Sequence, residues 1–265
     1  MTYTIPYKGS TIRFSEDGSG YPIILLHGYM ESLDVWDDFA ADLSKEYRVI
    51  SIDLPGHGKT GIFAPIHTMD IMAEIVDQVI KHLNIKGFVM IGHSMGGYVA
   101  LEYLAKYPNK LDGLVLFHST PLPDTEEKKK QRDQSIEQIK QGKKVAIAKE
   151  HVQKTFAQEN HQKFVKDIGF LKIIAINTSN DGIIAALEGM KRRKDHTQTI
   201  NNASIPIMLI LGEKDNFIPI DLPKKIKLAD NVKIEILKNS GHQGFIEEKE
   251  NSLKLIKSFV EQCKK

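Results

Sequence analysis

The chain has 265 residues, of which 41% are hydrophobic and 26% are charged, so it can bury a large core and is neither a disordered nor a fibrous protein. This length favours one domain with an insertion over two independent domains. The 36 basic and 34 acidic residues give a formal net charge of +2, and so balanced a charge predicts no nucleic-acid and no membrane partner.

Strand patterns begin at the N-terminus. Thr2–Tyr7 and residues 11–15 are β-rich runs separated by a short Lys-Gly-Ser segment, which predicts an opening hairpin. Compact apolar runs follow at residues 23–26, 49–52, 88–91, 114–117 and 207–211, and a last strand is expected at Val232–Leu237. Continuous apolar runs are typical of strands covered on both faces of a mostly parallel sheet.

Helical patterns lie between these strands. Residues 69–83 place Ile71, Ile75 and Val79 at helical spacing, and residues 95–107 form a second helical stretch. A final amphipathic helix is expected at about residues 248–262. This alternation of strands and helices predicts an α/β fold with a doubly wound sheet.

Residues 121–202 interrupt the alternation. The segment is rich in Lys, Gln and Glu and has helical patterns without a convincing strand, so we predict a helical cap inserted into a core made of residues 1–120 and 203–265. Pro121, Pro123 and Pro206 mark the expected hinges. The basic runs at residues 128–130 and 191–194 are interpreted as solvated helix faces. The apolar residues of the cap are expected to close over a small apolar acyl group; they include Ile168, Phe170, Leu171, Ile174, Ile183, Ile184 and Leu187.

A nucleophile is predicted at Ser94. It stands at the centre of Gly-His-Ser-Met-Gly, a G-x-S-x-G pattern at residues 92–96 that follows a predicted strand and precedes a predicted helix. A serine on such a tight turn exposes its hydroxyl above the sheet, and glycines on both sides leave room for the strained backbone. The following helix also presents free N–H groups to a developing oxyanion.

A serine hydroxyl needs a base, and the base needs an orienting acid. Asp215 lies just past the strand at residues 207–211, and His242 lies in the loop after the next strand. Because ligands and catalytic groups gather at the carboxyl ends of parallel strands, Ser94, Asp215 and His242 are expected to converge on one crevice. Glu213 and Asp124 are alternative orienting acids.

Two backbone N–H groups are predicted to stabilise an oxyanion. Met95 directly follows the nucleophile, and Tyr29 lies in the loop after the first core strand, where Gly28 gives the backbone room to turn. Each donor of this kind contributes about 3 kcal/mol when it is aimed correctly.

Four residues are candidates for contact with the substrate: Gly28, Trp36, His93 and His118. Trp36 also fits a core position, because apolar residues at helical spacing are more often buried in the core. His118 ends the strand before the cap, where it could face the pocket or cap the strand.

The chain resembles members of the α/β-hydrolase superfamily, close to the cofactor-free esterase, lactonase and haloperoxidase-like group. The resemblance rests on residues 27–29, 53–58 and 92–97, on Asp215, and on Gly241-His242. It implies an eight-stranded, mostly parallel sheet, a helical cap between strands six and seven, and hydrolysis of esters or related compounds without a cofactor.

Neither a metal nor a nucleotide is expected. The chain has no H-E-x-x-H pattern and no spacing of histidines and carboxylates that suits a metal ion. Residues 53–60 end like a phosphate-binding loop, but Asp53 stands where that loop needs glycine, which argues against ATP. A single cysteine, Cys263, excludes an internal disulfide, and with no targeting pattern a cytoplasmic location is the default expectation.

The sequence thus predicts a serine hydrolase that cleaves small soluble carboxylic esters through an acyl-enzyme. Lactone, thioester or carbon–carbon bond hydrolysis and perhydrolysis stay open as alternatives, because the cap rather than the triad selects among them. A serine at position 94 argues against haloalkane dehalogenation, which uses aspartate there. A ligand sensor with slow turnover is the alternative from another class. The expected partner is a small ester-like molecule, and no oligomeric state is predicted.

Overall fold

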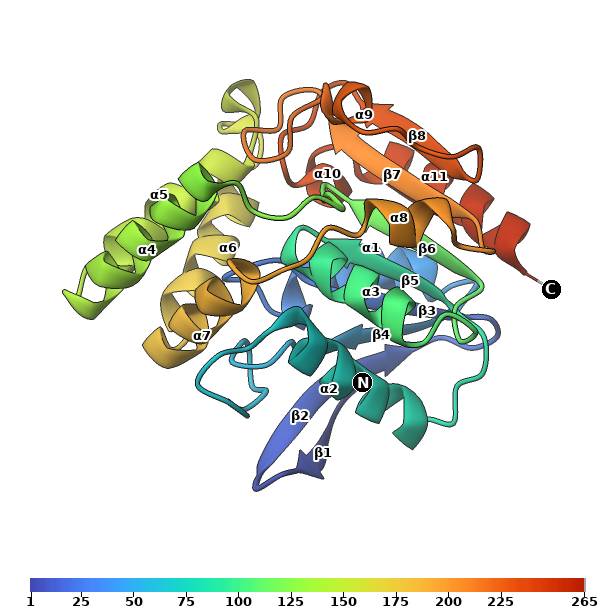
Figure 1. Cartoon of the computed structure of the whole chain (residues 1–265), viewed down its shortest axis with the longest axis horizontal. Helices are drawn as coiled ribbons and strands as arrows, with labels where there is room; N and C mark the ends of the chain where they lie inside the picture. The colour runs from blue at the N-terminus through green and yellow to red at the C-terminus, as the bar shows by residue number, and fades with distance from the viewer. Residues whose placement is uncertain (265) are drawn as a thin grey trace.

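The computed structural model describes residues 1–264 and contains one eight-stranded sheet with helices on both faces (Figure 1). The strands are β1 (Thr2–Tyr7), β2 (Ser10–Asp17), β3 (Pro22–Leu26), β4 (Arg48–Ile52), β5 (Val89–His93), β6 (Gly113–Phe117), β7 (Ile207–Gly212) and β8 (Val232–Leu237). Their order across the sheet is β1-β2-β4-β3-β5-β6-β7-β8. The predicted fold class and every predicted strand are confirmed.

Antiparallel pairing is confined to the two neighbours of β2. β1 pairs with β2 and β2 with β4 in antiparallel register, whereas all later neighbours are parallel. Every residue of β5, β6 and β7 is buried, which is why these strands read as unbroken apolar runs. Each fully buried Leu or Ile side chain there contributes about 1.5–3 kcal/mol to folding.

Two helical layers cover the sheet. In Figure 1, α2 (Met69–His82), α3 (Met95–Lys106) and α8 (Thr197–Asn201) lie in front of it, and α1 (Asp37–Leu43) and α11 (Lys249–Cys263) lie behind. The short elements η1 (Leu33–Trp36), α9 (Leu222–Lys225) and α10 (Gly244–Glu247) complete the core. The Thr68 side chain accepts a hydrogen bond from the N–H of Ile71 and so caps the start of α2.

The helices between β6 and β7 form the cap. They are α4 (Glu126–Lys140), α5 (Lys144–Thr155), η2 (Gln158–Asn160), α6 (Val165–Asn177) and α7 (Asn180–Met190), and they project to one side of the sheet (Figure 1). α8 falls inside the predicted cap but packs on α3 of the core. The end of the cap at residue 202 therefore stays a prediction. No single helix within residues 1–264 is long and apolar enough to cross a membrane, although α6 and α7 pass that test together across a bend of 95°.

The cap is anchored to the core at two places. On α7, a Cβ atom at Gly182 would lie 2.0 Å from the carbonyl oxygen of Gly56, and one at Gly189 would lie 1.7 Å from that of His67. At the end of α5, the carbonyl of Thr155 accepts a hydrogen bond of 2.6 Å from the backbone N–H of His242. The cap therefore contacts a predicted catalytic loop directly.

Candidate active site

Ser94 occupies the tight turn between β5 and α3. Its backbone has φ +50° and ψ −115°, a strained conformation for a residue with a side chain, and Ser94 is the one partly exposed residue in the buried segment 88–104. A Cβ atom at Gly96 would lie 2.4 Å from the carbonyl oxygen of Leu26. Glycine at this position therefore lets α3 start directly against the end of β3.

Asp215 and His242 meet at the carboxyl ends of β7 and β8. Asp215 Oδ2 accepts a hydrogen bond of 2.7 Å from His242 Nδ1, and its Oδ1 accepts from the N–H groups of Phe217 (2.7 Å) and Ile218 (3.1 Å). Burial alone raises the pKa of Asp215, but the neighbouring His242 and His118 hold it well below its usual range. Asp215 is thus an ionised acceptor that orients His242.

The alternative orienting acids lie elsewhere. The side chain of Glu213 is exposed. Asp124 is buried in the cap, where it pairs with Arg132 and Arg193. Among the three acids considered, only Asp215 contacts His242.

His118 supports Asp215 from behind. Its Nδ1 donates to Asp215 Oδ2 at 3.1 Å, and its Nε2 accepts from the N–H of Gly244 at 3.2 Å. Because one ring nitrogen donates and the other accepts, the ring is neutral, and burial lowers its pKa to about 4.

The ligand atoms of His118, Asp215 and His242 all lie within 4.8 Å of one another, a grouping that could hold a metal ion. Hydrogen bonds account for the grouping, because both Nδ1 atoms face the same carboxylate oxygen. The expectation that the site uses no metal stays a prediction.

His93 and Glu31 form a buried ion pair that the sequence did not reveal. His93 Nδ1 donates to Glu31 Oε2 at 3.0 Å, and Nε2 donates to the backbone carbonyl of His242 at 2.8 Å. The same carboxylate accepts from the N–H of Gly28 at 2.6 Å and from Gln243 Nε2 at 2.9 Å. Burial lowers the pKa of His93, but Glu31 more than offsets this and the net shift is upward. Since both ring nitrogens face acceptors, His93 is an imidazolium that joins the loops carrying Gly28 and His242.

Two backbone donors face no partner. Within residues 1–264, the N–H groups of Tyr29 and Met95 make no hydrogen bond to another group of the protein. Met95 is the first residue of α3, where an N–H has no partner inside the helix. These are the two N–H groups predicted to stabilise an oxyanion, and that role stays a prediction.

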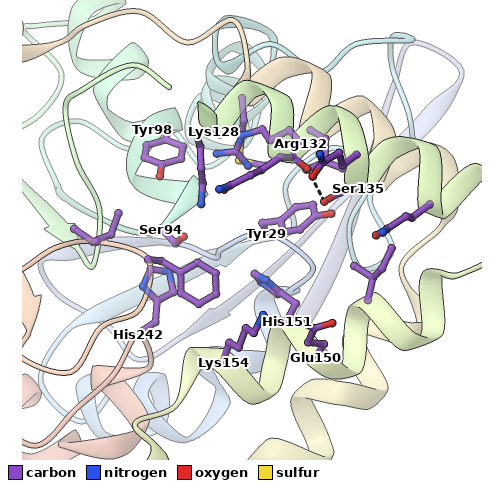
Figure 2. Close-up of a pocket in the computed structure, with 18 residues that line it drawn as sticks. Tyr29, Ser94, Tyr98, Lys128, Arg132, Ser135, Glu150, His151, Lys154 and His242 are labelled. Atoms are coloured by element: carbon purple, nitrogen blue, oxygen red, sulfur yellow. Dashed lines mark hydrogen bonds and ion pairs between the residues drawn. The ribbon is translucent and has the colours of Figure 1, made fainter. Parts of the chain in front are cut away.

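Ser94 and His242 line one cavity of about 430 Å³ (Figure 2). The core contributes Tyr29, Ser94, Tyr98, Phe217, Ile218 and His242 to its lining. Within the described residues, the Ser94 hydroxyl makes no hydrogen bond to His242. Such bonds are often long without substrate and tighten in the Michaelis complex.

None of the four predicted substrate contacts lies on this cavity in the part of the chain that the structure describes. Trp36 is fully buried and packs against Phe245, with ring centroids 4.2 Å apart and ring planes tilted by 36°. Gly28, His93 and His118 are hydrogen-bonded behind the cavity surface. These residues therefore support the site from the core, and the expectation that they touch the substrate does not fit their positions.

The cap side of the cavity, which we call the cap wall, is more polar than expected. It consists of Lys128, Gln131, Arg132, Gln134, Ser135, Gln138, Ile147, Glu150, His151, Lys154, Leu187 and Met190. Of the seven apolar cap residues expected to close over the substrate, only Leu187 is present. Lys128 was expected on a solvated face, but it lines the cavity because positions 128, 131, 132 and 135 fall on one face of α4.

Comparison with known proteins agrees with this geometry. A family model described as the alpha/beta hydrolase fold matches residues 21–249. The chain belongs to this family. It is 29% identical to the AB hydrolase superfamily protein YisY of Bacillus subtilis over 98% of this chain and 99% of that protein. It is 24% identical to a non-heme haloperoxidase of Rhodococcus erythropolis, covering 91% and 93% of the two chains.

A solved structure is similar over almost the whole fold. A thermophilic esterase from Thermogutta terrifontis, solved with malate bound, superposes with a TM-score of 0.92 at 25% identity, covering 99% of each chain. The resemblance stated from the sequence is therefore confirmed, and this α/β hydrolase is an enzyme.

Proposed function

We propose that this α/β hydrolase is a carboxylesterase that cleaves small soluble esters, with Ser94 as nucleophile, His242 as base and Asp215 as orienting acid. The observation that carries the proposal is the 2.7 Å hydrogen bond from His242 to Asp215 at the cavity that Ser94 and His242 both line. The likeness to an esterase at 25% identity over nearly the whole chain supports the same reaction class.

In the proposed mechanism Ser94 Oγ attacks the carbonyl carbon of the ester while His242 Nε2 takes its proton. Asp215 stabilises the imidazolium that forms, and the N–H groups of Tyr29 and Met95 donate to the oxyanion. Collapse of the tetrahedral intermediate expels the alcohol, which receives the proton from His242. A water molecule then attacks the acyl-enzyme by the same route and releases the acid.

Hydrolysis of p-nitrophenyl esters from acetate to palmitate, compared between the wild type and Ser94→Ala, tests the proposal. We expect serine-dependent turnover that peaks at short chains, and a loss of at least about 10³-fold in Ser94→Ala. Esterase activity retained by Ser94→Ala would refute the assignment of the nucleophile.

The same assay separates the alternatives. Lactones, thioesters and carbon–carbon substrates become the next candidates if no ester is turned over. Tight binding with one slow event, instead of many turnovers, would favour the ligand sensor.

A further inference from the structure

The cap wall is unusually cationic for a pocket that takes a neutral acyl group. Its charged lining consists of three cations, Lys128, Arg132 and Lys154, and one acid, Glu150. Lys154 and Glu150 neutralise each other through an ion pair of 2.6 Å. Two cations on α4 therefore remain to be accounted for.

Lys128 has no anionic partner. Within residues 1–264 it forms no ion pair, and its ammonium lies over the Phe217 ring, 5.8 Å from the centroid. Burial and the neighbouring Arg132 both lower the pKa of Lys128. The carboxylates of Asp124 and Glu127 offset this only in part, and neither forms an ion pair with Lys128. An ammonium held beside another cation, with no carboxylate in contact, is poised to bind an anion from outside.

Arg132 is only partly satisfied. Its Nε and Nη2 bind Asp124 at 2.5 and 3.1 Å, but Arg193 binds the same carboxylate, so two guanidinium groups share one negative charge. Within the described residues Nη1 of Arg132 makes no hydrogen bond. Nη1 is also not fully buried, and Arg132 lines the cavity.

The Tyr29 hydroxyl is a third unpaired group. It is buried and has no hydrogen-bond partner among the described residues, although Tyr29 lines the cavity. A buried hydroxyl without a partner costs about 1–3 kcal/mol, and a ligand oxygen that accepts its proton after a small movement of the Tyr29 side chain would recover that free energy. Figure 2 shows Tyr29, Lys128 and Arg132 around the same cavity as Ser94 and His242.

From these three unpaired groups we infer that the site selects esters carrying a second, anionic group, most simply a carboxylate. The carboxylate lies against Lys128, Nη1 of Arg132 and the Tyr29 hydroxyl while the ester carbonyl lies at Ser94. This inference rests on the proposed esterase function and names its substrate class: half-esters of dicarboxylic acids and other esters of anionic acids.

The test compares substrates whose main difference is the charge of the group remote from the scissile ester. Monomethyl and dimethyl esters of dicarboxylic acids from succinate to suberate are hydrolysed in a pH-stat, and kcat/KM for each monoester is divided by that for its diester. We expect the ratio to exceed unity in the wild type at the best chain length. Lys128→Met should lower it by roughly 10- to 100-fold, as expected for a hydrogen bond to a charged group, and Lys128→Arg should restore most of it.

Lys129→Met is the matched control, because Lys129 is the next residue on α4 and pairs instead with Glu126 at 2.7 Å. It should leave the ratio unchanged. A ratio that Lys128→Met does not alter, or a wild type that prefers the diesters, would overturn the inference.

A binding measurement separates the failure of the inference from that of the esterase proposal. Calorimetric titration of Ser94→Ala with adipate requires no turnover. Binding that Lys128→Met weakens by at least about 10-fold supports the anion site even if no ester is cleaved. An absence of adipate binding, or equal binding by both proteins, would overturn it.

Discussion

The two sides of the active-site cavity satisfy their polar groups in opposite ways. The floor, by which we mean Ser94, His242 and the buried groups behind them (Asp215, His118, His93 and Glu31), pairs its buried charges within the core. The cap wall leaves Lys128, Nη1 of Arg132 and the nearby Tyr29 hydroxyl without partners. A satisfied floor holds one geometry for the chemistry, whereas an unsatisfied wall has capacity left for a ligand.

The largest effect is expected from Asp215→Asn. Both carboxylate oxygens accept from N–H donors, so an amide placed either way turns its own NH₂ group toward a donor. His242 then loses the tautomer it needs, and kcat should fall by about 10³- to 10⁴-fold. Pre-steady-state and steady-state assays with p-nitrophenyl acetate measure the loss.

Glu213→Gln is the control for Asp215→Asn, because Glu213 is exposed and lies two residues before it. It should retain wild-type kcat. An Asp215→Asn enzyme that kept more than about a tenth of its activity would mean that the floor does not depend on this acid.

Glu31→Gln should destabilise the floor by removing one partner of its buried ion pair. It leaves the imidazolium of His93 buried without its counter-ion, which should cost about 3 kcal/mol of unfolding free energy. Urea denaturation of Glu31→Gln, His93→Gln and the double variant measures the coupling. The double variant should be more stable than additivity predicts, since no charge is then left unpaired. Strictly additive losses would show that the two side chains do not interact.

The pH dependence of stability should differ between His118 and His93, the two buried histidines behind the active site. Burial lowers the pKa of His118 to about 4, so in mild acid the unfolded chain binds its proton more readily than the folded chain does. Stability is therefore full above pH about 6.5 and falls as the pH drops toward 4, by about 2 kcal/mol for this residue between pH 7.5 and 5. His93 has a raised pKa, so its contribution is full below pH about 6.5 and is lost only as the pH rises through its folded value.

Urea denaturation at several pH values, with the wild type beside His118→Asn, isolates the contribution of His118 to the pH dependence of stability. The asparagine amide can still donate to Asp215 but does not titrate. The variant should lose about 2 kcal/mol less than the wild type between pH 7.5 and 5. Parallel pH profiles for the two proteins would contradict the assignment of a neutral His118.

The sequence predicted the part of the floor that depends on local structure. Ser94 follows from a strand–turn–helix pattern, and Asp215 and His242 follow from their places after parallel strands. Glu31 could not be found in this way, because its partners His93 and Gln243 lie 62 and 212 residues away and no spacing rule joins them. Trp36 was proposed for the pocket, but its place in the core depends on packing against Phe245.

The cap wall was harder to predict, because a basic amphipathic helix looks the same whether it faces water or a cavity. Lys128 and Lys129 are neighbours in the same charge run, yet only Lys128 lines the cavity. The signal available was the polar repeat at positions 128, 131, 132 and 135, and its meaning depends on where the cap docks. Docking is a tertiary property, set in part by close approaches such as that of Gly189 to His67.

The smallest effect is expected from Glu150→Gln on the rim of the cap wall. The Glu150–Lys154 ion pair is exposed, so its loss should change stability by no more than about 0.5 kcal/mol. It would nevertheless leave Lys154 unpaired and make the cavity more positive. At low salt this should raise kcat/KM for anionic half-esters about 2-fold, with no gain for the diesters. Because screening weakens exposed charges most, the gain should vanish in about 0.5 M salt. A gain that persisted at high salt, or that extended to the diesters, would mean that Glu150 acts on the shape of the cavity rather than on its potential.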